Sequence, residues 1–106
     1  MPKYLMEVSY TSEGSKGLQK DGGSKRRKAA QALIESLGGK IESLYFAFGD
    51  TDVIVIADLP DAASAAACSI ALATSGSATS KTTALLTPEE VDQATKKAAS
   101  YTPPGR

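Results

Sequence analysis

Residues 40–58 read KIESLYFAFGDTDVIVIAD, two runs rich in aromatic and β-branched side chains on either side of Gly49-Asp50-Thr51. Such runs favour β-strands, and a short break that contains Gly and Asp is typical of a hairpin turn. We therefore expect strands over 40–48 and 52–58. The second run is apolar at every position from 53 to 56, which predicts that both faces of the sheet are covered there.

Alternation along the first of these runs divides its large side chains between the two faces of the sheet. One face receives Leu44, Phe46 and Phe48. The opposite face receives the other apolar side chains of the run: Ile41, Tyr45 and Ala47. We expect both sets to need cover, because neither face of the hairpin is polar throughout.

Four further segments flank this hairpin along the chain. Residues 3–10 alternate large apolar with smaller or polar side chains and predict a strand. Residues 25–37 carry apolar side chains at helical spacing and end at two glycines, which predicts a helix. The alanine-rich stretch 62–74 predicts a second helix, and 78–86 resumes the composition of a strand.

The remaining segments are predicted to be less regular. Residues 11–24 hold four glycines among polar side chains and predict a long loop, with at most a short helical turn around 16–20. Loops of this length often wall functional sites. Thr87-Pro88-Glu89-Glu90 supplies a capping box for a short helix that reaches to about residue 99.

The predicted order is strand, helix, strand, strand, helix, strand, followed by one more helix. This order is that of the ferredoxin-like α+β fold, in which both helices cover one face of a four-stranded antiparallel sheet. A chain of 106 residues supports one hydrophobic core. We therefore expect a single domain over residues 1–100 and a flexible tail over 101–106.

Two helices cover only one face of such a sheet, so the second apolar face needs another cover. A second copy of the chain is the simplest one, and we expect a homodimer. The alternative is that the C-terminal helix folds back over the open face. A larger oligomer that forms through the remaining sheet edges, and acts as a scaffold, is a further alternative.

Composition limits the chemistry of the chain. Lys plus Arg and Asp plus Glu both total 12, so we expect neither nucleic acid nor a membrane as a partner. There is no histidine and Cys68 is the only cysteine, so we expect no zinc, copper or haem site and no cofactor. No apolar run is long enough for a signal peptide or a membrane span, and we expect a cytoplasmic protein.

A longer stretch carries a family resemblance. Residues 20–60, KDGGSKRRKAAQALIESLGGKIESLYFAFGDTDVIVIADLP, resemble the GYD domain family, and the resemblance extends from residue 3 to residue 90. It implies a small bacterial protein of the dimeric α+β barrel group, with no catalytic residue carried over. The family's Gly, Tyr and Asp cluster falls at Gly49-Asp50-Thr51-Asp52, where Thr51 replaces the tyrosine.

The first candidate site is Lys25-Arg26-Arg27-Lys28, at the start of a predicted helix. Cations there oppose the positive end of the helix dipole and repel one another, and we expect no acid three or four residues ahead to compensate. A bound carboxylate, phosphate or sulfate would balance them. The alternative is solvation, or pairing with acids of the chain itself: Glu7, Glu42, Asp50 or Asp52.

The second candidate site is the aromatic run that leads into the hairpin turn. Tyr45 and Phe48 would line a cavity with Asp50 or Asp52 at its mouth, although a core strand that ends in an ordinary turn has the same composition. Tyr10 lies on the apolar face of the first strand, and its hydroxyl needs a partner if buried. The predicted ligand-binding residues are therefore Tyr10, Lys25, Arg26, Arg27, Tyr45, Phe48 and Asp50.

These features favour a non-catalytic role, either binding of a small anionic or aromatic metabolite or a structural homodimer. The first alternative is a cofactor-independent isomerase or monooxygenase of the dimeric α+β barrel type. Its catalytic group would be Tyr45 or Asp50, with Arg26 or Arg27 clamping an anion. The second alternative is the oligomeric scaffold.

Overall fold

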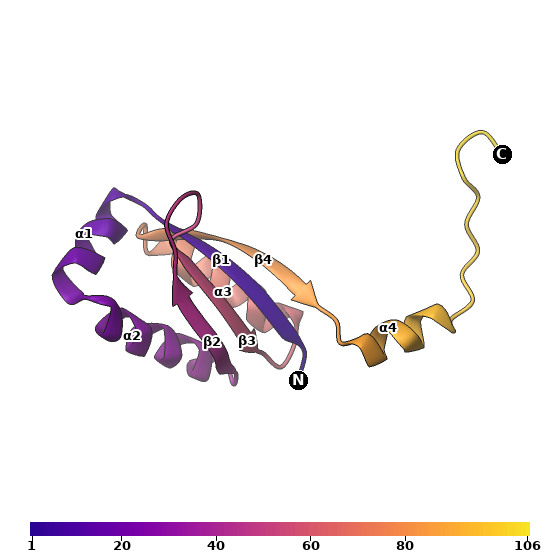
Figure 1. Cartoon of the computed structure of the whole chain (residues 1–106), viewed down its shortest axis with the longest axis horizontal. Coiled ribbons are helices and arrows are strands. Elements are labelled where there is room, and N and C mark those ends of the chain that lie inside the picture. Colours follow the sequence, from indigo (N-terminus) through magenta and orange to yellow (C-terminus); the bar gives the residue numbers. More distant parts are fainter.

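A computed structural model describes all 106 residues. Its elements, in chain order, are β1 (Lys3–Tyr10), α1 (Ser12–Asp21), α2 (Gly23–Ser36), β2 (Lys40–Phe46), β3 (Val53–Asp58), α3 (Ala62–Thr74), β4 (Ala78–Leu85) and α4 (Pro88–Thr95). Figure 1 shows α3 behind the sheet, α2 alongside β2, α1 beyond one end of the sheet and α4 projecting from the other. The predicted strands and three predicted helices are confirmed, with ends that differ by a few residues.

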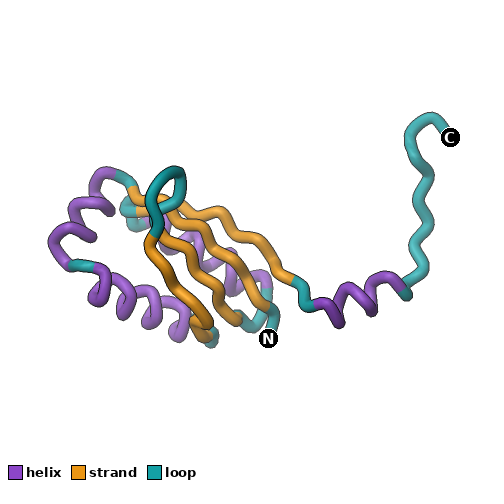
Figure 2. The backbone as a smooth tube through the Cα atoms, viewed as in Figure 1, coloured by secondary structure: helices purple, strands orange, loops and turns teal.

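The four strands form one antiparallel sheet in the order β2-β3-β1-β4. Strand β1 therefore lies in the middle, where Met6 pairs with Val55 on one side and with Thr82 on the other. The strands lie side by side in Figure 2, and the β2–β3 loop rises at their end. This arrangement agrees with the predicted ferredoxin-like α+β fold.

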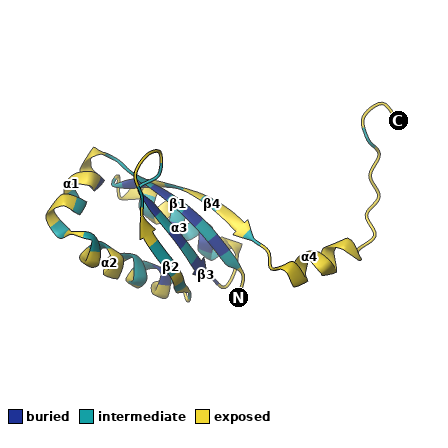
Figure 3. Cartoon of the chain, in the orientation of Figure 1, coloured by how far each residue is buried: buried dark blue, intermediate teal, exposed yellow.

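The core lies between the sheet and the helices α2 and α3. Alternate residues of β1 and β3 are buried on this side, and they appear as dark blue stripes in Figure 3. They pack with Ile34 of α2 and with Ala65 and Cys68 of α3. Asp61 caps α3 by accepting a hydrogen bond from the Ser64 N–H at 2.8 Å. Hydrogen bonding from the Ser64 side chain and from this N–H lowers the pKa of the Asp61 carboxyl.

The predicted face of Ile41 is wrong because the β2–β3 pairing contains a bulge. Ile41 pairs with Ala57, but Ser43 pairs with Ile56, so one residue is inserted between them. A bulge shifts the alternation of side chains on one strand. Ile41 therefore packs against the core on the helix side of the sheet, whereas Tyr45 faces the other side.

The predicted loop over residues 11–24 is also wrong, because most of it is the helix α1. Thr11 caps this helix by accepting a hydrogen bond from the Gly14 N–H, and its own hydroxyl donates to the Gly76 carbonyl at 2.8 Å. A Cβ at position 14 would collide with the Ser77 carbonyl, so this glycine permits close packing and is not a turn residue. The break comes at Gly22, whose φ of +80° favours glycine.

Helix α4 begins as predicted, with the Thr87 and Glu90 capping box fully formed. It has no buried residue, and it projects from the sheet instead of folding back over it. Leu86 and Val91 are therefore exposed. The sheet face opposite α2 and α3 carries no cover from this chain.

Gly39 offers a test of how closely the turn between α2 and β2 packs against the end of β3. A Cβ there would collide with the Asp58 carbonyl and lie 2.6 Å from a Leu59 methyl group. We expect Gly39→Ala to lower the free energy of unfolding by about 2 kcal/mol, which corresponds to a fall in Tm of about 10 °C.

The matched control is Gly17→Ala on α1, where a Cβ meets nothing within 4 Å. This change should raise the free energy of unfolding by roughly 0.5 kcal/mol, because Ala favours a helix over Gly. Calorimetry of the three proteins measures both values. Equal Tm values for Gly39→Ala and the wild type would contradict the packing described.

Candidate functional site

An apolar cavity of about 100 Å³ lies between the helix side of the sheet and the two core helices. Fourteen of its sixteen lining residues are hydrophobic, and the other two are Arg26 and Ser77. Met6 and Val55 come from the sheet, and Leu33 comes from α2. The small side chains of α3 leave this space, because an alanine-rich helix fills less of the gap than a leucine-rich one would.

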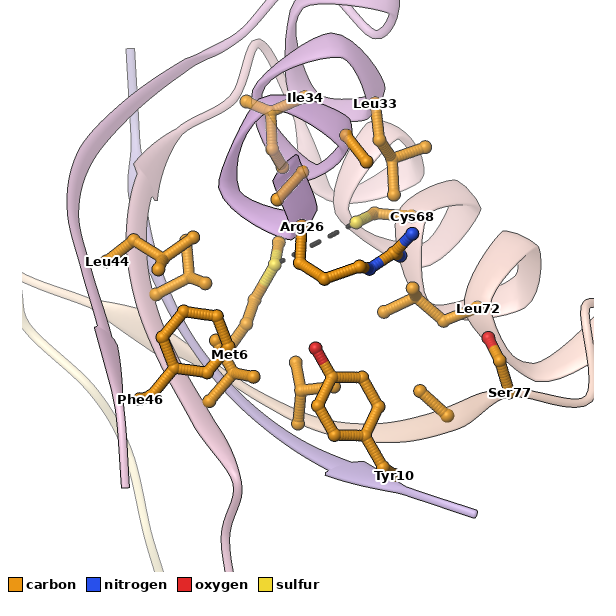
Figure 4. Close-up of a pocket in the computed structure, with 16 residues that line it drawn as sticks. Met6, Tyr10, Arg26, Leu33, Ile34, Leu44, Phe46, Cys68, Leu72 and Ser77 are labelled. Atoms are coloured by element: carbon orange, nitrogen blue, oxygen red, sulfur yellow. Dashed lines mark hydrogen bonds between the residues drawn. The ribbon is translucent and has the colours of Figure 1, made fainter. Parts of the chain in front are cut away.

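The polar side chains gather at one end of this cavity. In Figure 4 the Tyr10 hydroxyl points into it, and the Arg26 side chain extends across it toward Leu72. A second hollow of about 110 Å³ adjoins this end, since Tyr10, Arg26 and Ser77 line both. We call the apolar cavity the inner chamber and the second hollow the outer chamber. Glu13 and two glycines of α1 complete the outer chamber.

Arg26 owes its position to the junction between α1 and α2. It lies in the first turn of α2, and its Nη1 is 3.5 Å from the Asp21 Oδ2 at the end of α1. Asp21 also lies 3.6 Å from the Lys25 ammonium, four residues further on. The expectation that no acid compensates the basic run is therefore wrong, because Asp21 precedes Lys25 by four residues and lies beside both Lys25 and Arg26.

Tyr10 is held in place through its backbone. Its N–H donates to the Asp52 carboxylate at 2.7 Å, and the Asp52 N–H donates to the Val8 carbonyl at 2.9 Å. Asp52 thus fastens the β2–β3 loop to the end of β1 and fixes where the Tyr10 ring enters the cavity. The second aspartate of the Gly49-Asp50-Thr51-Asp52 segment, Asp52, therefore has a structural function.

Cys68 is a buried residue that lines the inner chamber. Its sulfur is 3.9 Å from the Met6 sulfur, and the dashed line in Figure 4 marks this contact. Burial raises the pKa of the Cys68 thiol, so little of it is the reactive thiolate. No three Cys, Asp or Glu side chains gather closely enough to hold a metal ion.

The inner chamber brings together only two of the predicted ligand-binding residues, Tyr10 and Arg26. The other five lie elsewhere, and their ligand-binding role stays a prediction. Lys25 and Arg27 are exposed on α2, Phe48 and Asp50 are exposed in the β2–β3 loop, and Tyr45 is 71% exposed on the open face of the sheet.

Two polar residues of the site were missed by sequence reasoning. Glu13 was placed in a loop, so its position on the first turn of a helix beside the cavity was not foreseen. Ser77 reaches the site because Thr11 binds the turn before β4, with a hydrogen bond of 2.9 Å from the Thr11 N–H to the Ser77 carbonyl. No sequence pattern signals such a long-range contact.

The fold and the cavity define a ferredoxin-like α+β protein with an internal, largely apolar hollow that opens beside α1. The chain matches the GYD domain family over residues 4–95, and it therefore belongs to that family. Comparison with curated proteins and with solved structures finds no match. None of its helices combines the length and the apolar character that crossing a membrane requires.

The Cys68 thiol provides a test of how closed the inner chamber is. We expect a small thiol reagent such as methyl methanethiosulfonate to modify Cys68 much more slowly in the native protein than in urea. Each unit by which burial raises the pKa reduces the thiolate fraction about tenfold. The native rate should therefore keep rising with pH beyond 9.0, the ordinary pKa of a thiol.

The control is a protein with Cys68→Ser and Ser24→Cys, whose single thiol lies on the exposed surface of α2. Its rate of modification should level off below pH 9, because the start of a helix and the neighbouring Lys25 stabilise the thiolate of an exposed cysteine. Stopped-flow absorbance or mass spectrometry measures both rates. Equal native rates and equal pH profiles would show that Cys68 is open to solvent.

Proposed function

We propose that this protein binds a small anionic metabolite that has an apolar body. The observation that carries the proposal is the single basic side chain, Arg26, at the mouth of an otherwise apolar chamber. Ligand sites combine an apolar lining with a few converging polar groups that orient the ligand. Arg26 and the Tyr10 hydroxyl are such a pair.

The volume of the inner chamber limits the size of the apolar part. An apolar cavity of about 150 Å³ in another protein stays dry and admits benzene. The inner chamber, at about 100 Å³, is smaller. A short branched aliphatic group or a compact ring fits this space, and its burial supplies the hydrophobic part of the affinity.

Arg26 is suited to hold the charged end of the ligand. Its side chain is 36% exposed, so it is partly shielded from water, and Asp21 at 3.5 Å occupies only part of its guanidinium. A guanidinium has five N–H donors and can grip a carboxylate through two of them while a second acid remains beside it. The ligand class we propose is therefore a small carboxylate.

Binding without catalysis is the function that this arrangement supports best. The catalytic groups expected for an isomerase or monooxygenase were Tyr45 and Asp50, and neither lines the chamber. A base must lie within hydrogen-bond reach of the proton that it removes. Within one chain, Tyr45 lies on the sheet face opposite the chamber, and Asp50 lies in the exposed β2–β3 loop.

A thermal-shift measurement tests the proposal. We expect 4-methylpentanoate, a carboxylate with a branched aliphatic body, to raise the Tm of the wild-type protein by several degrees at saturating concentration. Arg26→Gln should abolish this shift, because it removes the charge at the mouth of the chamber. Inorganic phosphate should give a smaller shift, since it has no apolar body to fill the chamber.

Arg27→Gln is the matched control, because it removes the same charge from the next residue of α2, which is exposed and does not line the chamber. It should bind 4-methylpentanoate as the wild type does. The proposal fails if the wild type shows no shift with carboxylates of this size, or if the two variants lose the shift equally.

We also propose that the protein is a homodimer joined through the open face of the sheet. The side chains that point away from the helices are apolar in the middle of this face, at Leu5, Ile54 and Ile56. Helix α4 does not cover them. The face also carries both charge signs, since Glu7 pairs with Lys81 across the strands. A second copy therefore meets an apolar centre between charges that can be complementary.

We expect this homodimer to act in the cytoplasm. The single buried thiol agrees with a reducing compartment.

At the edge of the open face, hydrogen bonds from the Lys3 ammonium to Asp58 at 2.9 Å and to Glu42 raise the pKa of Lys3. These charges border the apolar centre and would fix the orientation of the two copies.

Light scattering after size exclusion tests the dimer. We expect the wild type to have twice the mass of one chain, and Ile56→Lys, whose cross-strand neighbours are Leu5 and Ser43, to have the mass of one chain, because an unpaired charge in the apolar centre opposes association. Ile70→Lys, on the exposed side of α3, is the control and should remain dimeric. Circular dichroism verifies that both variants are folded. A monomeric wild type would refute the proposal.

A further inference from the structure

The outer chamber contains two side chains of opposite charge. Glu13 and Arg26 both line it, together with Tyr10 and Ser77. The Arg26 guanidinium has Asp21 as its acidic neighbour, whereas the Glu13 carboxylate has no Lys or Arg nitrogen within 4.0 Å. A ligand that enters past α1 therefore meets one cation and one anion, and the anion has the positive end of the α1 dipole beside it but no ion-pair partner.

Glu13 is held at this place by the contacts that fix α1. The Thr11 hydroxyl and N–H both donate to the turn before β4, at 2.8 Å to Gly76 and 2.9 Å to Ser77. Gly14 packs so closely on Ser77 that a side chain there would collide with it. The first turn of α1 is thereby fixed over the end of the sheet, and Glu13 lies on that turn.

A carboxylate beside the chamber repels a simple anion and attracts a cation. A ligand with only a carboxylate would be favoured by Arg26 and opposed by Glu13. A ligand that also has an ammonium group would be favoured by both. Tyr10, Arg26 and Ser77 line both chambers, so they mark the junction at which the apolar and polar parts of a ligand would separate.

We infer that the ligand is an apolar α-amino acid, with its carboxylate at Arg26, its ammonium toward Glu13 and its aliphatic side chain in the inner chamber. This inference rests on the proposed function and names its ligand class. The inner chamber, at about 100 Å³, matches a branched aliphatic side chain better than an aromatic one.

The test is a set of four ligands that differ by one group each, measured by calorimetry on the full chain. L-leucine has all three groups, 4-methylpentanoate lacks the ammonium, 3-methylbutylamine lacks the carboxylate, and glycine lacks the side chain. We expect L-leucine to bind with a Kd at least about tenfold lower than any of the other three, because a charged hydrogen-bonding group and a buried aliphatic side chain each contribute at least this factor.

Glu13→Gln should remove the advantage of L-leucine over 4-methylpentanoate and leave the affinity for 4-methylpentanoate unchanged or higher. Glu35→Gln, which removes an exposed acid from α2 that lines neither chamber, is the control and should keep the wild-type order of affinities. If Glu13 serves only to stabilise the first turn of α1, Glu13→Gln will lower the Tm and keep the leucine preference, which overturns the inference.

Protection of Cys68 locates the ligand independently of any variant. L-leucine at saturation should slow the modification of Cys68 by methyl methanethiosulfonate at least tenfold, because its side chain would occupy the chamber that leads to the thiol. Glycine at the same concentration should give no protection. Equal protection by both amino acids would overturn the inference.

The outcomes separate this inference from the proposed function. If the wild type binds 4-methylpentanoate as tightly as L-leucine, or more tightly, the amino-acid inference is wrong and the proposed carboxylate site stands. If none of the four ligands binds, both are wrong. A leucine preference that disappears in Glu13→Gln supports both.

Discussion

The end of β1 is held from both sides, and the shape of the molecule at this end depends on that constraint. From one side, the Asp52 carboxylate accepts the Tyr10 N–H at 2.7 Å. From the other side, the Thr11 N–H and hydroxyl donate to the turn before β4. Because β1 is the central strand, these few hydrogen bonds align a hairpin loop, a helix start and a turn that are far apart in sequence.

This alignment explains why the cavity has a polar end and an apolar end. The apolar end is the ordinary space between a sheet and two helices, left partly unfilled because α3 is rich in alanine. The polar end exists only because α1 is fixed over the sheet and ends at Asp21, beside Arg26. The fold alone supplies the hollow, whereas the junction of α1 and α2 supplies its charge.

The parts of the fold that could be predicted are those that local sequence determines. The alternation of β1 and the capping of α3 and α4 depend on neighbouring residues, and their predicted starts agree with the structure. Helix α1 was missed because Gly14 looks like a turn residue until its contact with Ser77 is known. Ile41 was assigned to the wrong face because the bulge beside it depends on how β2 pairs with β3.

The candidate site could likewise be predicted only where local sequence determines it. The basic run was identified from sequence, but the helical phase that turns Arg26 inward and Arg27 outward depends on where α2 begins. Tyr45 and Phe48 were reasonable candidates by composition, and only the sheet and the loop show that they face solvent. Composition alone does not show which face of the sheet a side chain occupies, whereas the folded structure does.

The self-contained capping of α4 has a consequence for the shape of the protein in solution. The N–H of Thr87 donates to the Glu90 carboxylate and the N–H of Glu90 donates to the Thr87 hydroxyl, so this capping uses no group of the sheet. The projecting arm extends the molecule to 56 Å and gives a radius of gyration of 16.8 Å, against about 13 Å for a compact chain of this length. The protein should therefore diffuse and scatter as an elongated particle, with a small globular body and a projecting C-terminal arm.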